Sequence, residues 1–262
     1  MPNKIKSNIK HLLFTTWMLF PVASFAEGHV TFTTGVDYSS GKYGQSQSTD
    51  ITYIPLIGKY EFDDTTIKLT VPWVKITGPG DVVGGSGPVV LGQSNRPITT
   101  ESGLGDIVLS VSQTVAQIGS SKPLMLDLTG KIKFATASES KGLGTGKNDY
   151  TISLDAYKSV AHSLTLFGDI GYKVLGDPSG VKLDDVWFSS AGVSYKINPS
   201  SSAGMMANIR QATQSTSDPM RELTLFASHK FNAQYKLQGY LSHGYSDATA
   251  DWGGGMMLGL MF

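Results

Sequence analysis

The amino-acid sequence predicts an all-β protein: a single transmembrane, antiparallel, up-and-down β-barrel of about twelve strands. Three observations lead to this prediction. Apolar and polar residues alternate in repeated blocks of about ten residues, the length of a tilted strand that crosses a bilayer. The connections between the blocks alternate between short and long, which is typical of outer-membrane barrels. The chain ends on an apolar strand, ADWGGGMMLGLMF, with no polar tail after Phe262.

The composition suits a chain that hides its apolar residues by alternation. Of 262 residues, 40% are hydrophobic and only 16% are charged, against roughly 25% charged in an ordinary soluble domain. The mean hydropathy of −0.06 is too low for a bundle of membrane helices. No basic patch indicates nucleic-acid binding. Cysteine is absent, so an exported chain of this kind would be held together without disulfides.

The first 26 residues have the three parts of a secretory signal peptide. MPNKIKSNIK is basic, HLLFTTWMLFPV is apolar, and ASFA places small residues at a cleavage site after Ala26. The alternative is a retained anchor helix, but the apolar run is shorter than the roughly 20 residues that span a bilayer. Cleavage would remove three lysines and no acid, which changes the formal net charge from 0 to −3. The predicted domains are therefore a signal peptide, 1–26, and a barrel, 27–262.

Each strand is predicted from a block of alternation bounded by turn-forming residues. Aromatic residues near the block ends, such as Tyr38, Trp73, Trp187 and Trp252, suit the girdles of a membrane barrel. The competing interpretation is a soluble periplasmic β-sandwich or propeller, which also carries aromatics at strand ends. The blocks begin at His29, Asp50, Thr66, Gly105, Leu124, Asp149, Ser163, Asp185, Ser202, Glu222, Tyr235 and Asp251.

The connections predict which end of the barrel faces outward. Short ones lie at 63–64, 119–123, 161–162, 198–201 and 232–234, and longer ones at 41–49, 78–104, 139–148, 176–184, 214–220 and 246–250. An even strand number returns both termini to the periplasmic side. The connection 78–104 is too long for a simple hairpin loop, and loops of this length are usually functional or disordered. We expect it to fold into the mouth as a constriction; the alternative is a mobile surface loop.

One face of the strands carries charges, and that face is predicted to line the lumen because a charge against lipid costs roughly 2–4 kcal/mol. The charges guide a passing solute, or they form ion pairs that stiffen the wall. Barrels of about eight strands are filled by side chains, and barrels of about sixteen strands leave an open channel. A barrel of twelve strands lies between these sizes, which predicts a narrow passage. The predicted lumen-lining residues are Lys68, Asp127, Lys131, Lys133, Asp155, Asp169, Lys173, Arg210, Glu222, Lys230 and Lys236.

No motif in the chain predicts a cofactor, a metal site or a catalytic site. GLGTGKND at 142–149 lacks the spacing and the helix of a phosphate-binding loop. Asp177, Asp184 and Asp185 could hold Ca²⁺, but their spacing is not that of an EF-hand. A barrel enzyme acting on lipid is a third alternative, since His229 and His243 lie on adjacent predicted strands with Ser228 and Ser242 near them. No recognisable motif surrounds these residues, and we expect no enzyme.

Three stretches resemble a known family. They are IKLTVPWVKITGPGDV (67–82), TTESGLGDIVLSVS (99–112) and GLGTGKNDYTISLDA (142–156). They are similar to outer-membrane transporters grouped as the MetA-pathway of phenol degradation family, with Gly-Leu-Gly-Asp at 103–106 and Gly-Thr-Gly-Lys before Asp149 as the most familiar marks. The resemblance implies an outer-membrane barrel that passes small, aromatic or hydrophobic molecules. The charged lumen of this chain argues against an aromatic hydrocarbon.

Together these features predict a monomeric channel in the outer membrane of a Gram-negative cell, open to passive diffusion of small solutes. The second interpretation is an occluded structural or adhesive barrel that binds a partner through its outward loops. The last strand is expected to pair with the first, between His29 and Tyr38, and to face lipid with alternate residues. Its terminal pattern also resembles the signal that the barrel-assembly machinery reads, carried by Trp252, Met256, Leu258, Leu260 and Phe262.

Overall fold

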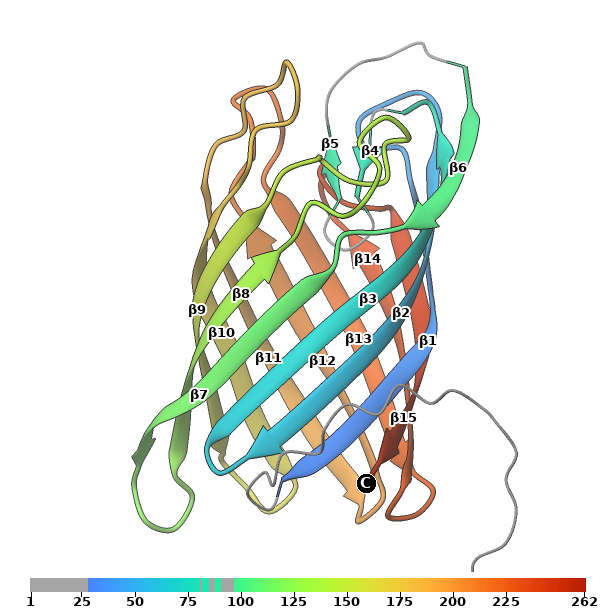
Figure 1. Ribbon diagram of the computed structural model, residues 1–262. Helices are drawn as coiled ribbons and strands as arrows, with labels where there is room; N and C mark the ends of the chain where they lie inside the picture. The colour runs from blue at the N-terminus through green and yellow to red at the C-terminus, as the bar shows by residue number, and fades with distance from the viewer. Residues whose placement is uncertain (1–27, 81, 85–87, 91–96) are drawn as a thin grey trace, which may run out of the picture.

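The strands wind into a closed antiparallel barrel, which confirms the predicted fold class (Figure 1). The computed structural model describes residues 28–80, 82–84, 88–90 and 97–262, so the predicted signal peptide lies outside the described residues. The twelve barrel strands of this part of the chain are β1 (His29–Gly41), β2 (Thr49–Phe62), β3 (Thr65–Gly78), β7 (Val108–Ile118), β8 (Leu124–Lys133), β9 (Asp149–Ser159), β10 (Leu164–Val174), β11 (Val186–Asn198), β12 (Ser201–Arg210), β13 (Met220–Lys230), β14 (Tyr235–Gly244) and β15 (Trp252–Met261). All twelve coincide with the predicted blocks to within a few residues.

Three further strands lie inside the connection 78–104, which the sequence predicted only as a loop. β4 (Val82–Val83) and β5 (Val89–Val90) form a small separate hairpin, and β6 (Thr99–Leu104) joins the main sheet. β3 pairs with β7 through Thr65–Thr70 and with β6 through Trp73–Gly78. Pro72 lies between these two stretches of β3, where β7 gives way to β6 as the neighbouring strand. Proline has no N–H to donate to a neighbouring strand, and at this position none is needed. The carbonyl of Pro72 accepts the N–H of Gly105 at 2.9 Å.

The barrel closes between the first and last strands, as predicted. β1 and β15 are antiparallel, with the register running from Thr31 opposite Met261 to Ser40 opposite Trp252. The N–H of Phe262 adds a bond to the carbonyl of Val30 at 2.9 Å. Closure pairs the backbone groups that an open sheet would leave at its two edges.

The outer face of the wall is apolar, because alternate residues of each strand point away from the lumen. Leu56, Ile152, Ile209 and Leu241 are among the large apolar side chains exposed there. Aromatic pairs stand near the strand ends, such as Tyr172 with Trp187, whose ring centroids are 5.1 Å apart. Four residues of the predicted assembly signal lie on the outward face of β15, and Phe262 follows directly after the strand. The four are Trp252, Met256, Leu258 and Leu260. Within the described residues, no helix is long and apolar enough to span a membrane.

The two ends of the barrel differ in their connections (Figure 1). At the short-turn end, β strands are joined by the turns 63–64, 119–123, 160–163, 199–200 and 231–234, and the chain terminus after β15 also lies there. At the long-loop end lie the connections 42–48, 79–107, 134–148, 175–185, 211–219 and 245–251. This alternation agrees with the predicted short and long connections.

Candidate functional site: a charged lumen

The inward-facing side chains surround a large cavity in the middle of the barrel, with a volume of about 640 Å³. Its uncharged lining includes Tyr53, Phe188 and Met206. Of the eleven predicted lumen residues, seven line this cavity: Lys68, Lys131, Lys133, Asp169, Lys173, Arg210 and Glu222.

The other four predicted residues lie nearer the short-turn end. Asp127 and Asp155 stand directly opposite each other in the ladder of β8 and β9, and Asp155 stands opposite Asp169 of β10. Directly opposed residues share a face of the sheet, so all three aspartates face the lumen. Lys230 and Lys236 are opposed in the last pair of the β13–β14 ladder, next to the turn 231–234.

Ion pairs gather at one place in the lumen wall, close to the long-loop end. The Nζ atom of Lys133 lies 2.8 Å from Asp106 and 3.5 Å from Asp149, and Nζ of Lys173 lies 3.0 Å from Asp149. The side chains of Asp106 and Asp149 are only 9% and 4% exposed. Burial of charges is favourable only when each is paired and hydrogen-bonded, and this cluster meets that condition.

This ion-pair cluster also explains the two sequence marks of the family resemblance. Asp106 ends the Gly-Leu-Gly-Asp segment, and Thr145 belongs to the Gly-Leu-Gly-Thr-Gly-Lys segment. Both contact the same ammonium, because Lys133 Nζ donates to Asp106 Oδ2 at 2.8 Å and to Thr145 Oγ1 at 3.0 Å. The other oxygen of Asp106 accepts the N–H of Ala137 at 3.0 Å. The two motifs therefore fix the long loop 134–148 to the barrel wall.

The remaining predicted charges form no ion pair with another described residue. The aspartates accept hydroxyl hydrogen bonds instead: Thr114 donates to Asp127 at 2.7 Å and Thr129 to Asp155 at 2.6 Å. Glu222 accepts the amide of Asn208 at 3.3 Å. Among the described residues, no carboxylate lies within 4.0 Å of the cationic groups of Lys68, Lys131, Arg210, Lys230 or Lys236.

The β4–β5 hairpin, residues 82–84 and 88–90 as described, lies in the mouth of the barrel and packs against both sides of it. Val82 joins a buried cluster with Ile51 and Val74 of the β2–β3 wall. Val83 and Val89 join a second cluster with Leu175, Leu183 and Val186, which belong to β11 and the loop before it. The carbonyl of Val90 accepts a hydrogen bond at 2.9 Å from the side-chain amide of Gln214, which belongs to the loop 211–219.

The hairpin covers the ion-pair cluster and leaves only a small space between them. A cavity of about 30 Å³ is bounded by Val83 and Val89 of the hairpin and by Lys133, Asp149 and Lys173 of the wall. The expected inward fold of the connection 78–104 is therefore seen in its described residues. Among the described residues, the hairpin therefore narrows this side of the mouth to a small space.

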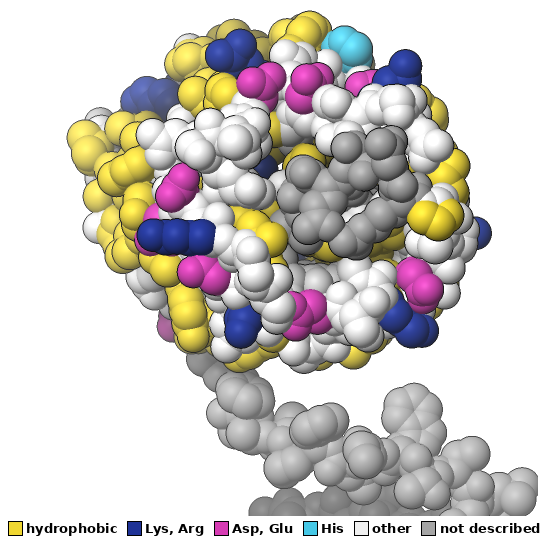
Figure 2. Space-filling model, turned by 90° about the horizontal axis from the view of Figure 1, so that it is seen from above, with side chains coloured by type: hydrophobic (Ala, Val, Ile, Leu, Met, Phe, Trp, Pro, Cys, Tyr) yellow, Lys and Arg dark blue, Asp and Glu magenta, His cyan; other side chains and the backbone are white. Residues whose placement is uncertain are grey.

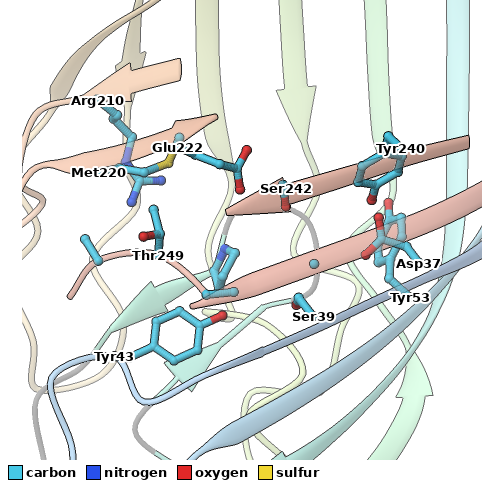
Figure 3. A pocket seen from close by; sticks show the side chains of 14 residues that line it. Asp37, Ser39, Tyr43, Tyr53, Arg210, Met220, Glu222, Tyr240, Ser242 and Thr249 are labelled. Atoms are coloured by element: carbon cyan, nitrogen blue, oxygen red, sulfur yellow. The ribbon is translucent and has the colours of Figure 1, made fainter. Parts of the chain in front are cut away.

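On the opposite side of the mouth a second cavity remains, with a volume of about 260 Å³ (Figure 3). It is bordered by Asp37 of β1, Tyr240 of β14 and Pro88 of the hairpin connection. Four residues line both this cavity and the large central one, so the two spaces adjoin at a junction formed by Tyr53, Arg210, Met220 and Glu222.

Charged groups of both signs also surround the mouth at the long-loop end (Figure 2). Glu139 in the loop 134–148 accepts the backbone N–H of Ser179 at 3.1 Å, which ties two loops together. Hydrogen bonds from the side chain and then the backbone of Ser179 hold the pKa of Glu139 below its usual range. The carboxylates of Asp177 and Asp185 accept the N–H groups of Leu183 and Leu175, so both act as local loop braces.

Several lumen residues were missed by the sequence analysis. Asp106 and Asp149 stand at strand boundaries, where the alternation of apolar and polar residues does not show which face a side chain is on. Their place in the two motifs is the signal that could have identified them. Asp37 lies mid-strand, and alternation in β1 would have placed it with Thr33 on the inward face. Lys59 of β2, which pairs with Glu61 at 2.7 Å, could have been found in the same way.

The serines and histidines of the alternative enzyme interpretation are not aligned with each other. Ser228 faces the lumen and bonds Ser202 at 2.9 Å, whereas the next residue, His229, faces outward and bonds Ser201 at 2.8 Å. Ser242 lines the mouth cavity, so His243 faces outward. Among the described residues, no group of three or more His, Cys, Asp or Glu side chains is placed to hold a metal ion.

Two solved outer-membrane channels share this fold. The COG4313 outer membrane channel from Pseudomonas putida F1 superposes with a TM-score of 0.66 at 11% identity, over 94% of this chain and 100% of that one. The NanC porin gives a TM-score of 0.53 at 10% identity, over 88% of this chain and 98% of that one. No protein-family model matches the sequence, so the resemblance to the MetA-pathway family is not confirmed by one. No curated protein matches it either. At these identities the likeness establishes the barrel fold.

Proposed function

We propose that this protein is an outer-membrane channel through which small solutes diffuse passively along a narrow, charge-lined lumen. The observation that carries the proposal is the pair of adjoining cavities, about 640 and 260 Å³, inside a barrel whose outer face is apolar. Side chains do not fill the interior, and the inner lining carries charged groups while the apolar outer belt suits lipid. The fold shared with the COG4313 channel and the NanC porin supports the same assignment.

In this proposal the long-loop end faces the outside of the cell and the short-turn end faces the periplasm. Residues 1–26 direct export and are removed, and the outward residues of β15 serve the barrel-assembly machinery. The proposed working unit is a monomer, since each chain closes its own sheet and a pore needs no second chain. Solutes enter beside the β4–β5 hairpin and pass the junction of Tyr53, Arg210, Met220 and Glu222.

The hairpin supports a second candidate, an occluded barrel that binds partners through its outward loops. Its valines pack against both sides of the mouth, as a plug would. Planar-bilayer recording of the purified protein separates the two. We expect discrete conductance steps in KCl; a correctly folded barrel that inserts and carries no current would refute the channel and favour the plug. No enzymatic activity is proposed.

A further inference from the structure

Four lysines of the lumen lie on one hydrogen-bonded row of the barrel wall. Lys59 is opposite Lys68, Lys68 is opposite Ser110, and Ser110 is opposite Lys131. Lys131 is opposite Thr151, which in turn is opposite Lys173. We call Lys59, Lys68, Lys131 and Lys173 the lysine track.

The track runs from one end of the lumen to the other. Strands of a barrel are tilted against its axis, so a row that follows the hydrogen bonds climbs as it passes round the wall. Lys59 lies close to the end of β2 that enters the turn 63–64, whereas Lys173 is next to the last residue of β10, at the long-loop end. A solute could therefore meet one ammonium after another on its way through.

The middle of the track has no counter-ion of its own. Lys173 is paired with Asp149 at 3.0 Å and Lys59 with Glu61 at 2.7 Å. For Lys68 and Lys131, no carboxylate of the described residues lies within 4.0 Å. Like charges in one cross-strand row are destabilising, so this arrangement favours an anion that comes from outside the protein.

The central cavity gathers three lysines of the track with two further cations, Lys133 and Arg210. Lys68, Lys131, Lys133, Lys173 and Arg210 line it, against the carboxylates of Asp169 and Glu222. The Nε atom of Arg210 is buried without a hydrogen-bond partner in the described structure. Asp169 accepts the hydroxyl of Ser190 with Oδ2 while its Oδ1 is buried without a partner, and Glu222 accepts the amide of Asn208. Among the described lining residues, cationic side chains therefore outnumber carboxylates in this cavity by five to two.

We propose that the lysine track selects small organic carboxylates and carries them from the Arg210 junction toward the periplasm. This inference rests on the proposed channel function and names its solute class. The ammonium groups receive the carboxylate, and Tyr53, Phe188 and Met206 offer apolar surface to the rest of the solute. The volume of about 640 Å³ is within the range of small-molecule sites.

The test is block of single-channel KCl current by three probes of similar shape: benzoate, benzyl alcohol and benzylammonium. The protein is purified from outer membranes and recorded in planar bilayers. We expect anion preference in the reversal potential under a KCl gradient, and block by benzoate alone. The double variant K68Q/K131Q should raise the half-blocking concentration of benzoate about tenfold, through loss of two charge-assisted contacts. K68R/K131R should keep the block, and K122Q, in an exposed turn, should match the wild type.

The outcomes separate the two proposals. A folded barrel that conducts no current overturns the channel function itself. A barrel that conducts with cation preference, or that is blocked equally by benzylammonium, refutes the selection of carboxylates by the lysine track. The proposed channel function is not affected by that result. Heat-modifiable mobility on gels checks that the variants fold. If the double variant does not fold, the comparison of the three probes on the wild-type protein still tests whether the lumen selects carboxylates.

Discussion

Asp155 on β9 is the direct cross-strand neighbour of two other aspartates, Asp127 on β8 and Asp169 on β10. Like charges directly opposed in a sheet repel one another. The wall compensates with hydroxyl groups: Thr129 donates to Asp155 at 2.6 Å, and Ser190 donates to Asp169. The acidic row and the lysine track are four residues apart along β8, β9 and β10, and the acidic row lies nearer the short-turn end.

We predict that Asp155→Asn stabilises the folded barrel. The substitution removes both repulsive pairs, each worth about 0.2–1 kcal/mol, and the amide oxygen can still accept the Thr129 hydroxyl. Urea unfolding in detergent, followed by tryptophan fluorescence, measures the difference. Asp218→Asn, in the exposed loop 211–219, provides the control and should leave stability unchanged. A less stable Asp155→Asn barrel would show that the hydrogen bonds outweigh the repulsion.

Replacement of residues 82–90 by a short Gly-Ser linker is predicted to raise single-channel conductance. The hairpin packs through Val82 on one side of the mouth and through Val83 and Val89 on the other, so its removal widens the mouth. Gln214→Leu is a milder change that removes only the bond to the Val90 carbonyl. We expect it to keep the conductance level and increase brief fluctuations. Unchanged conductance after the replacement would mean that the hairpin does not limit the flow.

Most of the barrel could be predicted from the sequence, because a strand between lipid and water must alternate. Asp127, Lys131 and Lys173 were placed on the lumen face for that reason alone. The hairpin could not be predicted in the same way, since β4 and β5 are only two residues each and pack by contact with distant loops. The pairing of charges was also out of reach, because it depends on strand register, and one slip of two residues would give Lys133 other neighbours.

Asp149→Asn is predicted to destabilise the long-loop end of the barrel by about 2 kcal/mol, the usual cost of losing hydrogen bonds to a charged group. Its carboxylate contacts both Lys133 and Lys173, and its side chain is only 4% exposed. The neutral amide would leave Lys173 without a carboxylate partner among the described residues. Urea unfolding measures the loss. Asp247→Asn, a change of the same kind in the loop 245–251, should have little effect; equal losses in both variants would exclude a special role for Asp149.

Gly204→Val is predicted to destabilise the barrel by about 1–3 kcal/mol, the typical cost of overpacking. Gly204 of β12 faces the lumen, and a Cβ atom there would collide with the ring of Phe226 and the carbonyl of Val193. The ring of Phe226 also packs near Phe167, with centroids 6.0 Å apart, so it has little room to move. Gly130→Val on β8, where a Cβ would meet nothing within 4 Å, is the matched control. Equal stability of the two variants would contradict the packing argument.

Deletion of Phe262 is predicted to impair insertion into the outer membrane more than it impairs the folded barrel. The side chain is 65% exposed on the outer face, and its edge contact with Phe32 has ring centroids 6.1 Å apart. Little packing is therefore lost, apart from the bond of its N–H to the Val30 carbonyl. Two measurements distinguish the roles: the amount of heat-modifiable barrel in cell envelopes, and the yield of refolding into detergent from urea. We expect the first to fall sharply while the second stays close to wild type. Phe262→Tyr should restore insertion, because it keeps a terminal aromatic ring. Normal insertion of the deletion variant in cells would mean that Phe262 is not part of the assembly signal.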